Sequence, residues 1–167
     1  MNYKLKILFS LTILFILISC SEKHNETVLK AVNYDELKQI LNKEDNVLYV
    51  VNFWATWCGP CVEELPGFME VNNEFGKQKN FQMILVSLDN AKELETTVKL
   101  FLQKNKINTD VYILDDNLRM NFWIPDIDRS WSGALPATLI IKNGKKLFFT
   151  EGQMNKTYLK KVILQKQ

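Results

Sequence analysis

The sequence has few residues that could bind a metal ion, with three Cys and one His among 167 residues. A structural zinc site needs about four ligands. Cys58 and Cys61 could supply half of such a site, but the other candidates, Cys20 and His24, lie far from them and near the N-terminus. The sequence therefore argues against zinc, and it predicts no metal and no cofactor.

The chain also has little excess charge, with 21 Lys and Arg against 19 Asp and Glu. Loss of an N-terminal segment containing Lys4 and Lys6 would make the two counts equal. A balance this close to zero does not suggest a nucleic-acid partner or an anionic membrane surface. The 47% of hydrophobic residues is enough to build the core of one domain of ordinary size.

The N-terminus has the pattern of a signal peptide. Two lysines in Met1–Lys6 precede the apolar run Ile7–Ile18, which is short for a bilayer span but typical of a signal-peptide core. A membrane helix is the alternative. The run ends at Leu17-Ile18-Ser19-Cys20, which resembles the lipobox of bacterial lipoproteins, where cleavage leaves Cys20 as the lipidated first residue.

This interpretation divides the chain into three parts. We expect a signal peptide, a polar tether that contains a solvated His24, and one folded domain, over residues 1–19, 20–27 and 28–167. With Cys20 lipidated, the two remaining thiols are Cys58 and Cys61. Because both remaining cysteines belong to one motif, the chain would have no other free thiol to oxidise, which suits an oxidising extracytoplasmic compartment.

An apolar run that ends in these two cysteines is the central motif. Val47–Phe53 is apolar except for Asn52 and predicts a buried strand, and a helix-like pattern follows Cys58. Cysteines three residues apart at a helix start lie on one face and can close a disulfide ring. The helix start favours a thiolate at Cys58, the nucleophile, while the deeper Cys61 suits the resolving role. The motif predicts thiol–disulfide exchange. A structural disulfide is the alternative, although so short a loop would stabilise the fold by only roughly 2 kcal/mol.

The residues around the cysteines resemble a known family. Trp57-Cys58-Gly59-Pro60-Cys61 is similar to the thioredoxin active site, and the flanks 52–57 and 64–66 resemble the TlpA/ResA-like branch of extracytoplasmic thioredoxin-fold proteins. The resemblance covers roughly residues 28–165. It implies an α/β thioredoxin fold, a three-layer α/β/α sandwich with a central helix-strand insertion, in the order β-α-β-α-β-(α-β)-α-β-β-α.

The resemblance also implies which residues contact a substrate. Ser132–Ile141 resembles the thioredoxin-fold loop whose cis proline abuts the dithiol and leaves the preceding backbone free to pair with an extended substrate. We therefore expect a cis bond between Leu135 and Pro136. The implied substrate-binding residues are Trp57, Gly59, Pro60, Leu135 and Pro136.

Proton handling is the point at which this chain departs from thioredoxin. Thioredoxin has a buried carboxylate at the position of Asn52, and an amide cannot act as a base. Asp89, at the end of the apolar run Phe81–Asp89, and Glu64 are the candidate replacements. The match at Asp89 could also fall on Asn90 or Glu93, and an aspartate that caps a turn or helix is the alternative for Asp89.

Local patterns predict the remaining elements. Asn33 and Asn155 have the positions of helix caps, and Asn143-Gly144 predicts a hairpin turn. Ala91–Lys104 has a helical apolar stripe and Val111–Leu114 reads as a strand, together forming the insertion. The segment 115–132 reads as a long irregular loop, whose aromatic residues either pack in the core, as we favour, or contact a substrate.

These patterns predict a lipid-anchored thiol–disulfide oxidoreductase that faces the periplasm or extracytoplasmic space. Gly-Pro between the cysteines resembles the reducing members, so we expect reduction of protein disulfides, in cytochrome c maturation or in envelope redox homeostasis. Electrons would come from a membrane dithiol, and the protein would be a monomer with no nucleic-acid partner. Two alternatives are a thiol peroxidase, whose Pro-x-x-x-Thr-x-x-Cys pattern is absent, and a non-catalytic module that binds thiol proteins.

Overall fold

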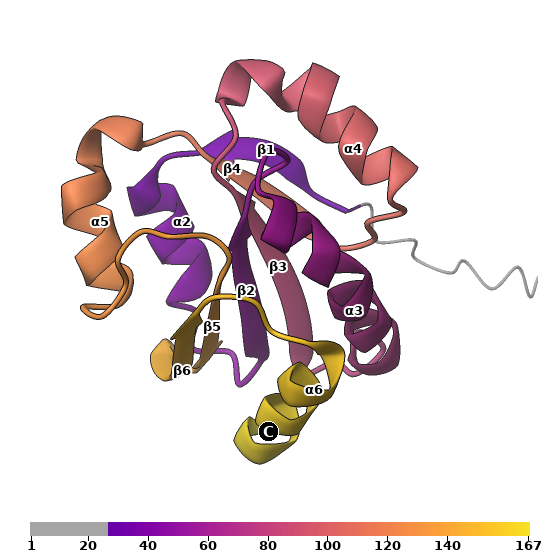
Figure 1. The fold of residues 1–167 in the computed structure, drawn as a ribbon. Coiled ribbons are helices and arrows are strands. Elements are labelled where there is room, and N and C mark those ends of the chain that lie inside the picture. Colours follow the sequence, from indigo (N-terminus) through magenta and orange to yellow (C-terminus); the bar gives the residue numbers. More distant parts are fainter. Residues whose placement is uncertain (1–26) are drawn as a thin grey trace, which may run out of the picture.

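A six-stranded sheet forms the centre of residues 27–167, the part of the chain that the computed structural model describes. The strand order is β1-β4-β3-β2-β5-β6, and helices cover both faces (Figure 1). Within this part, no helix is long and apolar enough to span a bilayer. The signal-peptide prediction, Cys20 and His24 lie outside the described residues.

Four neighbouring strands run parallel and the last two form a hairpin. The strands are β1 (Leu29–Val32), β2 (Leu48–Trp54), β3 (Phe81–Ser87), β4 (Asp110–Leu114), β5 (Ala137–Lys142) and β6 (Lys145–Glu151). β2 pairs with β3 in parallel and with β5 in antiparallel, and every residue of β2 is buried. The continuous apolar pattern of this strand therefore reflects its central place in the sheet.

Two helical layers pack against the sheet. On one face lie α2 (Tyr34–Leu41) and α5 (Met120–Ile127), and on the other lie α3 (Gly59–Phe75), α4 (Lys99–Lys104) and α6 (Lys156–Lys166) (Figure 1). Each face has its own cluster of buried apolar side chains. This arrangement is the predicted three-layer α/β/α sandwich, with β4 inserted between β1 and β3.

The local signals for caps and turns are confirmed. Asn33 and Glu36 form a capping box at the start of α2, and the Asn155 side chain accepts a hydrogen bond from the Tyr158 N–H at the start of α6. Asn143 and Gly144 both have positive φ values, as a two-residue hairpin turn requires. The Leu135–Pro136 peptide bond is cis, as predicted.

Two element predictions are wrong. One regular helix was expected over Ala91–Lys104, but the segment consists of a 3₁₀ turn (Ala91–Glu93), a π turn (Leu94–Val98) and α4. The π turn has a wider hydrogen-bond spacing than an α-helix, so it interrupts the α-helical pattern. The segment 115–132 is no long loop, because it contains a 3₁₀ turn (Asn117–Arg119) and α5. α5 takes the place of the helix that the predicted element order puts before the hairpin. Its Trp123 and Trp131 are buried, which agrees with the packing role favoured for its aromatic residues.

Candidate active site

The two cysteines lie where the chain leaves β2 and enters α3. Cys58 is the N-cap residue of α3, and Pro60 lies in the first turn, where a missing N–H costs little. Cys58 and Cys61 form a disulfide with an S–S distance of 2.02 Å. Cys58 is 7% exposed and Cys61 is fully buried. A substrate can therefore reach Cys58 first, as the sequence predicts.

A backbone donor at the start of α3 contacts the Cys58 sulfur. The Cys61 N–H lies 3.3 Å from Cys58 Sγ, so the sulfur itself caps the helix. The first N–H groups of a helix carry partial positive charge, and they stabilise a negative group placed at this end. After reduction, the same position favours a thiolate at Cys58, which is the form that a nucleophilic cysteine needs.

A surface groove of about 600 Å³ opens beside Cys58. One wall is the motif itself, with Trp57, Gly59 and Pro60. The opposite walls come from the end of β3, the segment before and within α5, and the loop before β5, through Leu88, Asn117, Met120, Gly133, Ala134 and Leu135. Trp57 is 68% exposed, so its large apolar ring stands at the rim of the groove.

The loop around the cis proline is held from both sides and leaves the backbone N–H and carbonyl of one residue free. The Ala134 carbonyl accepts a hydrogen bond from the Trp131 indole, and the Pro136 carbonyl accepts one from the Gly152 N–H. Between them, the N–H and carbonyl of Leu135 have no hydrogen-bond partner in the part of the chain that the structure describes. An extended peptide in the groove can use these two groups.

Glu64 is a buried carboxyl group one helical turn after Cys61. Its oxygens accept hydrogen bonds from the Asn52 side-chain amide at 2.8 Å and from the Met154 N–H at 2.8 Å. Burial raises the pKa of Glu64 from 4.5 to about 7, although both hydrogen bonds oppose the rise. Asn52 thus orients a carboxyl group by hydrogen bonding, which is the role the sequence left open to it.

Glu64 also has access to solvent. It lines a surface hollow of about 460 Å³ between the first half of α3 and the segment before α6, together with Gly67, Gln153 and Asn155. Cys61 and Glu64 share one face of α3 because they are three residues apart. The structure thus places the Glu64 carboxyl group on the cysteine face of α3 and beside a surface hollow.

Asp89 has a different environment. Its oxygens accept hydrogen bonds from the Thr56 N–H at 3.0 Å, the Thr56 hydroxyl at 2.6 Å and the Ser87 hydroxyl at 2.6 Å. These contacts tie the end of β3 to the turn that carries Trp57 and Cys58. Asp89 is therefore a positioning residue for the motif, and a part in proton handling stays a prediction.

The structure adds groove residues that the sequence did not identify. Leu88, Asn117 and Met120 face Cys58 across the groove, although they lie 30 or more residues away in the chain. The only signal for Asn117 and Met120 was their place in the segment 115–132, for which substrate contact was one alternative. Among residues 27–167, no group of three or more His, Cys, Asp or Glu residues could hold a metal ion.

Comparison with known proteins adds to this geometry. Residues 24–149 match the model of the AhpC/TSA family. The chain belongs to the AhpC/TSA family. Among curated proteins, this family member is similar to the thiol-disulfide oxidoreductase ResA of Bacillus cereus, with 31% identity over 110 residues that cover 65% of the chain and 57% of ResA. The resemblance to ResA-like proteins is thereby confirmed.

Solved structures show the same fold. StoA from Bacillus subtilis is 22% identical, with a TM-score of 0.58, over 74% of this AhpC/TSA-family chain and 86% of StoA. A putative thiol:disulfide interchange protein DsbE from Chlorobium tepidum is 25% identical, also with a TM-score of 0.58, over 73% and 81% of the two chains. The thioredoxin fold is therefore confirmed. The chain spans from 10% to 61% of the length of several curated relatives that it matches.

Proposed function

We propose that this protein is a thiol–disulfide oxidoreductase that reduces disulfides of protein substrates. The observation that carries the proposal is the position of Cys58, whose sulfur caps a helix and opens into an apolar groove. A disulfide that served only stability would need neither a groove nor a free backbone pair at Leu135. The ResA relative, which is named a thiol-disulfide oxidoreductase, supports the same activity.

The reaction starts from the reduced dithiol. The Cys58 thiolate attacks one sulfur of the substrate disulfide, that bond breaks, and one substrate thiolate leaves. Cys61 then loses its proton, attacks the Cys58 sulfur of the mixed disulfide and releases the second substrate thiol. Two electrons have passed to the substrate, and the protein is left with the Cys58–Cys61 disulfide seen in the structure.

Glu64 is the group we assign to proton transfer at Cys61. A base that works near neutral pH needs a pKa near that pH, and burial gives Glu64 a pKa of about 7. Its place one turn from Cys61 and its contact with the solvent-filled hollow support this assignment. Asp89, which is fully engaged with Thr56 and Ser87, contributes by fixing the motif.

The groove suits an extended peptide with an apolar side chain next to its cysteine. The apolar walls come from Trp57, Pro60, Met120 and Leu135. The N–H of Leu135 supplies a hydrogen-bond donor, and its carbonyl supplies an acceptor. We propose that the substrate is a disulfide-containing protein of the cell envelope, such as a cytochrome c precursor, and that a membrane dithiol returns the electrons. The protein acts as a monomer without a cofactor.

We propose further that the chain is anchored to the membrane by a lipid at Cys20. Residues 1–19 would be the signal peptide, 20–27 the tether and 28–167 the catalytic domain, on the extracytoplasmic side. The apolar run Ile7–Ile18 and the lipobox-like residues before Cys20 support this arrangement. Mass spectrometry of the protein from bacterial membranes tests it, because a diacylated N-terminal Cys20 is expected.

Reduction of insulin by the protein tests the activity. With dithiothreitol as electron source, the wild-type chain should accelerate insulin precipitation, and Cys58→Ser should lower the rate to that of dithiothreitol alone because the nucleophile is lost. Thr97→Ser is the matched control, because Thr97 is exposed and does not line the groove. A wild-type rate equal to the background would refute the reductase and leave the non-catalytic binding module and the thiol peroxidase.

The thiol peroxidase is the weaker alternative. Such an enzyme needs a Thr and an Arg beside its reactive cysteine, but the Thr56 hydroxyl donates to Asp89, and Arg119 forms ion pairs with Asp35 and Asp116. Consumption of hydrogen peroxide faster than insulin reduction would reverse this preference.

A further inference from the structure

Lysine side chains gather at the end of the sheet opposite the dithiol. Cys58 follows the carboxyl end of β2, whereas the amino end of β2 pairs with Phe81 and with Lys142. Lys142 in turn pairs with Lys145 across the hairpin. We call the lysines at this end the basic pole, which comprises Lys43, Lys77, Lys79, Lys104, Lys106, Lys142, Lys145 and Lys166.

Several elements place these lysines together. Lys77 and Lys79 lie between α3 and the start of β3, and Lys104 and Lys106 lie between α4 and the start of β4. Asn108, just before β4, hydrogen-bonds to Asn72 and Asn73 near the end of α3, so these two connections meet. At the end of α6, Gln167 hydrogen-bonds to Gln78 and Lys142, which brings Lys166 to the same end.

Few negative charges balance this pole. Four carboxylates lie at the same end, those of Glu44, Asp45, Glu74 and Asp110. Asp110 already accepts hydrogen bonds from Gln82 and from the Val28 N–H. Glu74 forms an ion pair with Lys160. None of the eight pole lysines forms an ion pair with another residue of the described range 27–167. Lysines on the helices elsewhere, such as Lys156 and Lys160, do pair with glutamates.

The net charge conceals this separation. The whole chain has 21 basic and 19 acidic residues. Three of the basic residues (Lys4, Lys6 and Lys23) and two of the acidic residues (Glu22 and Glu26) precede residue 27, so 18 basic and 17 acidic residues remain in the described part. Eight of the 18 basic residues lie at the pole, against four of the 17 acidic residues. The sequence balance, which suggested no anionic membrane surface, therefore does not describe this end of the molecule.

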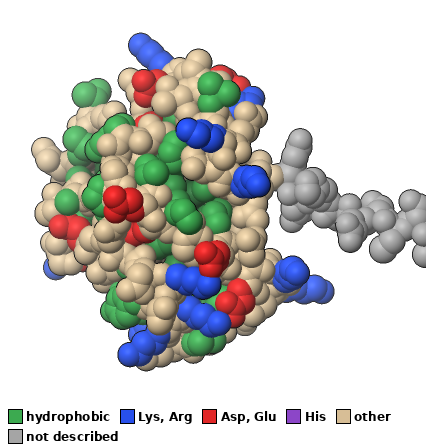
Figure 2. All heavy atoms as spheres, turned by 45° about the vertical axis from the view of Figure 1, so that its right-hand side comes forward, with side chains coloured by type: hydrophobic (Ala, Val, Ile, Leu, Met, Phe, Trp, Pro, Cys, Tyr) green, Lys and Arg blue, Asp and Glu red, His purple; other side chains and the backbone are tan. Residues whose placement is uncertain are grey.

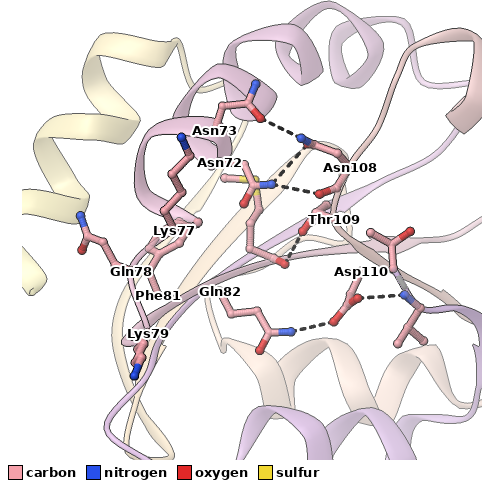
Figure 3. Close-up of a pocket in the computed structure, with 14 residues that line it drawn as sticks. Asn72, Asn73, Lys77, Gln78, Lys79, Phe81, Gln82, Asn108, Thr109 and Asp110 are labelled. Carbon is pink, nitrogen blue, oxygen red and sulfur yellow. Dashed lines mark hydrogen bonds between the residues drawn. The ribbon is translucent and has the colours of Figure 1, made fainter. Parts of the chain in front are cut away.

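Two lysines of the pole, Lys77 and Lys79, line a polar pocket of about 740 Å³ (Figure 3). Asn72, Asn73 and Asn108 hydrogen-bond to one another in its wall, while the Lys77 and Lys79 side chains stand free at its rim. Lys77 and Lys79 are both exposed. Asp110 also lines the pocket, and its two carboxylate oxygens accept hydrogen bonds from the Val28 N–H and the Gln82 side chain. With that carboxylate engaged, the cationic rim groups and amide walls fit a phosphate-containing headgroup.

The described chain begins at this same end. Thr27, the first described residue, lines the pocket, and basic side chains lie on this side of the described domain (Figure 2). Only six residues separate Thr27 from Cys20. Fully extended, they span on the order of 20 Å, so an anchor at Cys20 would keep the basic pole next to the bilayer.

We propose that the basic pole docks on an anionic phospholipid surface and receives lipid headgroups in the pocket. Lysines near such a surface are attracted to it, and the attraction acts within about a Debye length. Docking in this orientation directs the dithiol and its groove away from the bilayer, toward proteins of the envelope. The geometry of this proposal rests on the membrane anchor in the proposed function.

Lysine footprinting on vesicles tests the docking. The full-length protein is reconstituted into vesicles of phosphatidylcholine alone or with phosphatidylglycerol, and a water-soluble acetylating reagent is followed at each lysine by mass spectrometry. Lys77, Lys79, Lys104 and Lys106 should react several-fold more slowly on the anionic vesicles. Raising the salt to 1 M, which shortens the Debye length to about 3 Å, should remove the difference.

Lys92, an exposed lysine that follows the carboxyl end of β3, is the internal control. The charge reversal Lys77→Glu/Lys79→Glu should restore the reactivity of Lys104 and Lys106, whereas Lys92→Glu should leave them protected. Equal rates on both kinds of vesicle, or equal slowing of Lys92, would overturn the proposal. Stronger protection by a short oligonucleotide than by anionic vesicles would also overturn it.

Insulin reduction in the same vesicles separates this proposal from the proposed function. Activity without protection of the pole lysines would refute the docking alone. Loss of the protein from neutral vesicles on washing would refute the anchor, and lack of insulin reduction would refute the redox activity.

Discussion

Glu64 is a carboxyl group whose surroundings favour opposite charge states. Burial disfavours the ionised form, while the hydrogen bonds from Asn52 and Met154 favour it, and burial prevails. The Asn52 side-chain oxygen is buried without a hydrogen-bond partner among the described residues. If the Asn52 side-chain amide rotates by about 180°, that oxygen can accept a hydrogen bond from the protonated Glu64 carboxyl group. The pair can therefore form a hydrogen bond in both charge states of Glu64.

The stability of the fold should therefore depend on pH through Glu64. Its pKa rises from 4.5 in the unfolded chain to about 7 in the fold, so its stabilising effect is complete below about pH 4.5 and is lost as pH rises through 7. Between pH 5 and 8, the free energy of unfolding should fall by on the order of 2 kcal/mol. Urea unfolding of the oxidised protein at several pH values measures this change.

Glu64→Gln should remove most of this pH dependence, because an amide does not ionise. Glu63→Gln changes the neighbouring exposed glutamate and should retain the wild-type dependence. If Glu64→Gln kept the same fall in stability between pH 5 and 8, another group would be responsible.

At the scale of elements, the segment between β4 and β5 shows what sequence patterns could not predict. α5 has only eight residues, contains Pro125 and is apolar on most of its surface, so it lacks the periodic stripe of an amphipathic helix. Contacts with α2 define it instead, because Asp126 accepts hydrogen bonds from Tyr34 and Lys38. Helices as short as α5 depend on such tertiary contacts.

Other elements could be predicted because their signals are local. The apolar run of β2, the caps Asn33 and Asn155 and the hairpin turn at Asn143-Gly144 each depend on a few consecutive residues. The two cysteines were found in the same way. The far wall of the groove could not be found, because the fold brings Leu88 and Met120 to Cys58 from distant positions in the chain.

Met120 should contribute to substrate binding, since it lines the groove and is 41% exposed. Met120→Lys places a charge in the apolar wall and should raise the KM for insulin several-fold, with a smaller effect on kcat. Leu118→Lys is the matched control, because Leu118 lies two residues away, is fully exposed and does not line the groove. An equal rise of KM in both variants would show that charge alone, and not the groove, has the effect.

At the scale of the whole molecule, the fold separates two ends with different chemistry. Parallel strands bring the turn with Cys58, the segment around Asp89 and the start of α5 to one end of the sheet. The amino ends of the same strands carry the basic pole and the start of the described chain. The resemblance predicted this strand arrangement, whereas the distribution of charge between the two ends emerged only from the structure.

The direction of electron flow is also a property of the whole molecule, because it depends on the relative stability of the oxidised and reduced folds. We expect a reduction potential close to that of thioredoxin, about −270 mV, since Gly59-Pro60 between the cysteines resembles the reducing members. Equilibration with glutathione or dithiothreitol buffers measures the potential. A value near about −120 mV, as in the oxidant DsbA, would make the protein an oxidase.

The capture of a mixed disulfide tests the central claim most directly. When Cys61→Ser is mixed with oxidised insulin, a covalent complex should accumulate, and mass spectrometry should locate its bond at Cys58, because the resolving thiol is absent. Cys58→Ser under the same conditions should give little or no complex, because Cys61 is fully buried. A complex formed mainly through Cys61, or none from either variant, would contradict the assignment of Cys58 as the nucleophile.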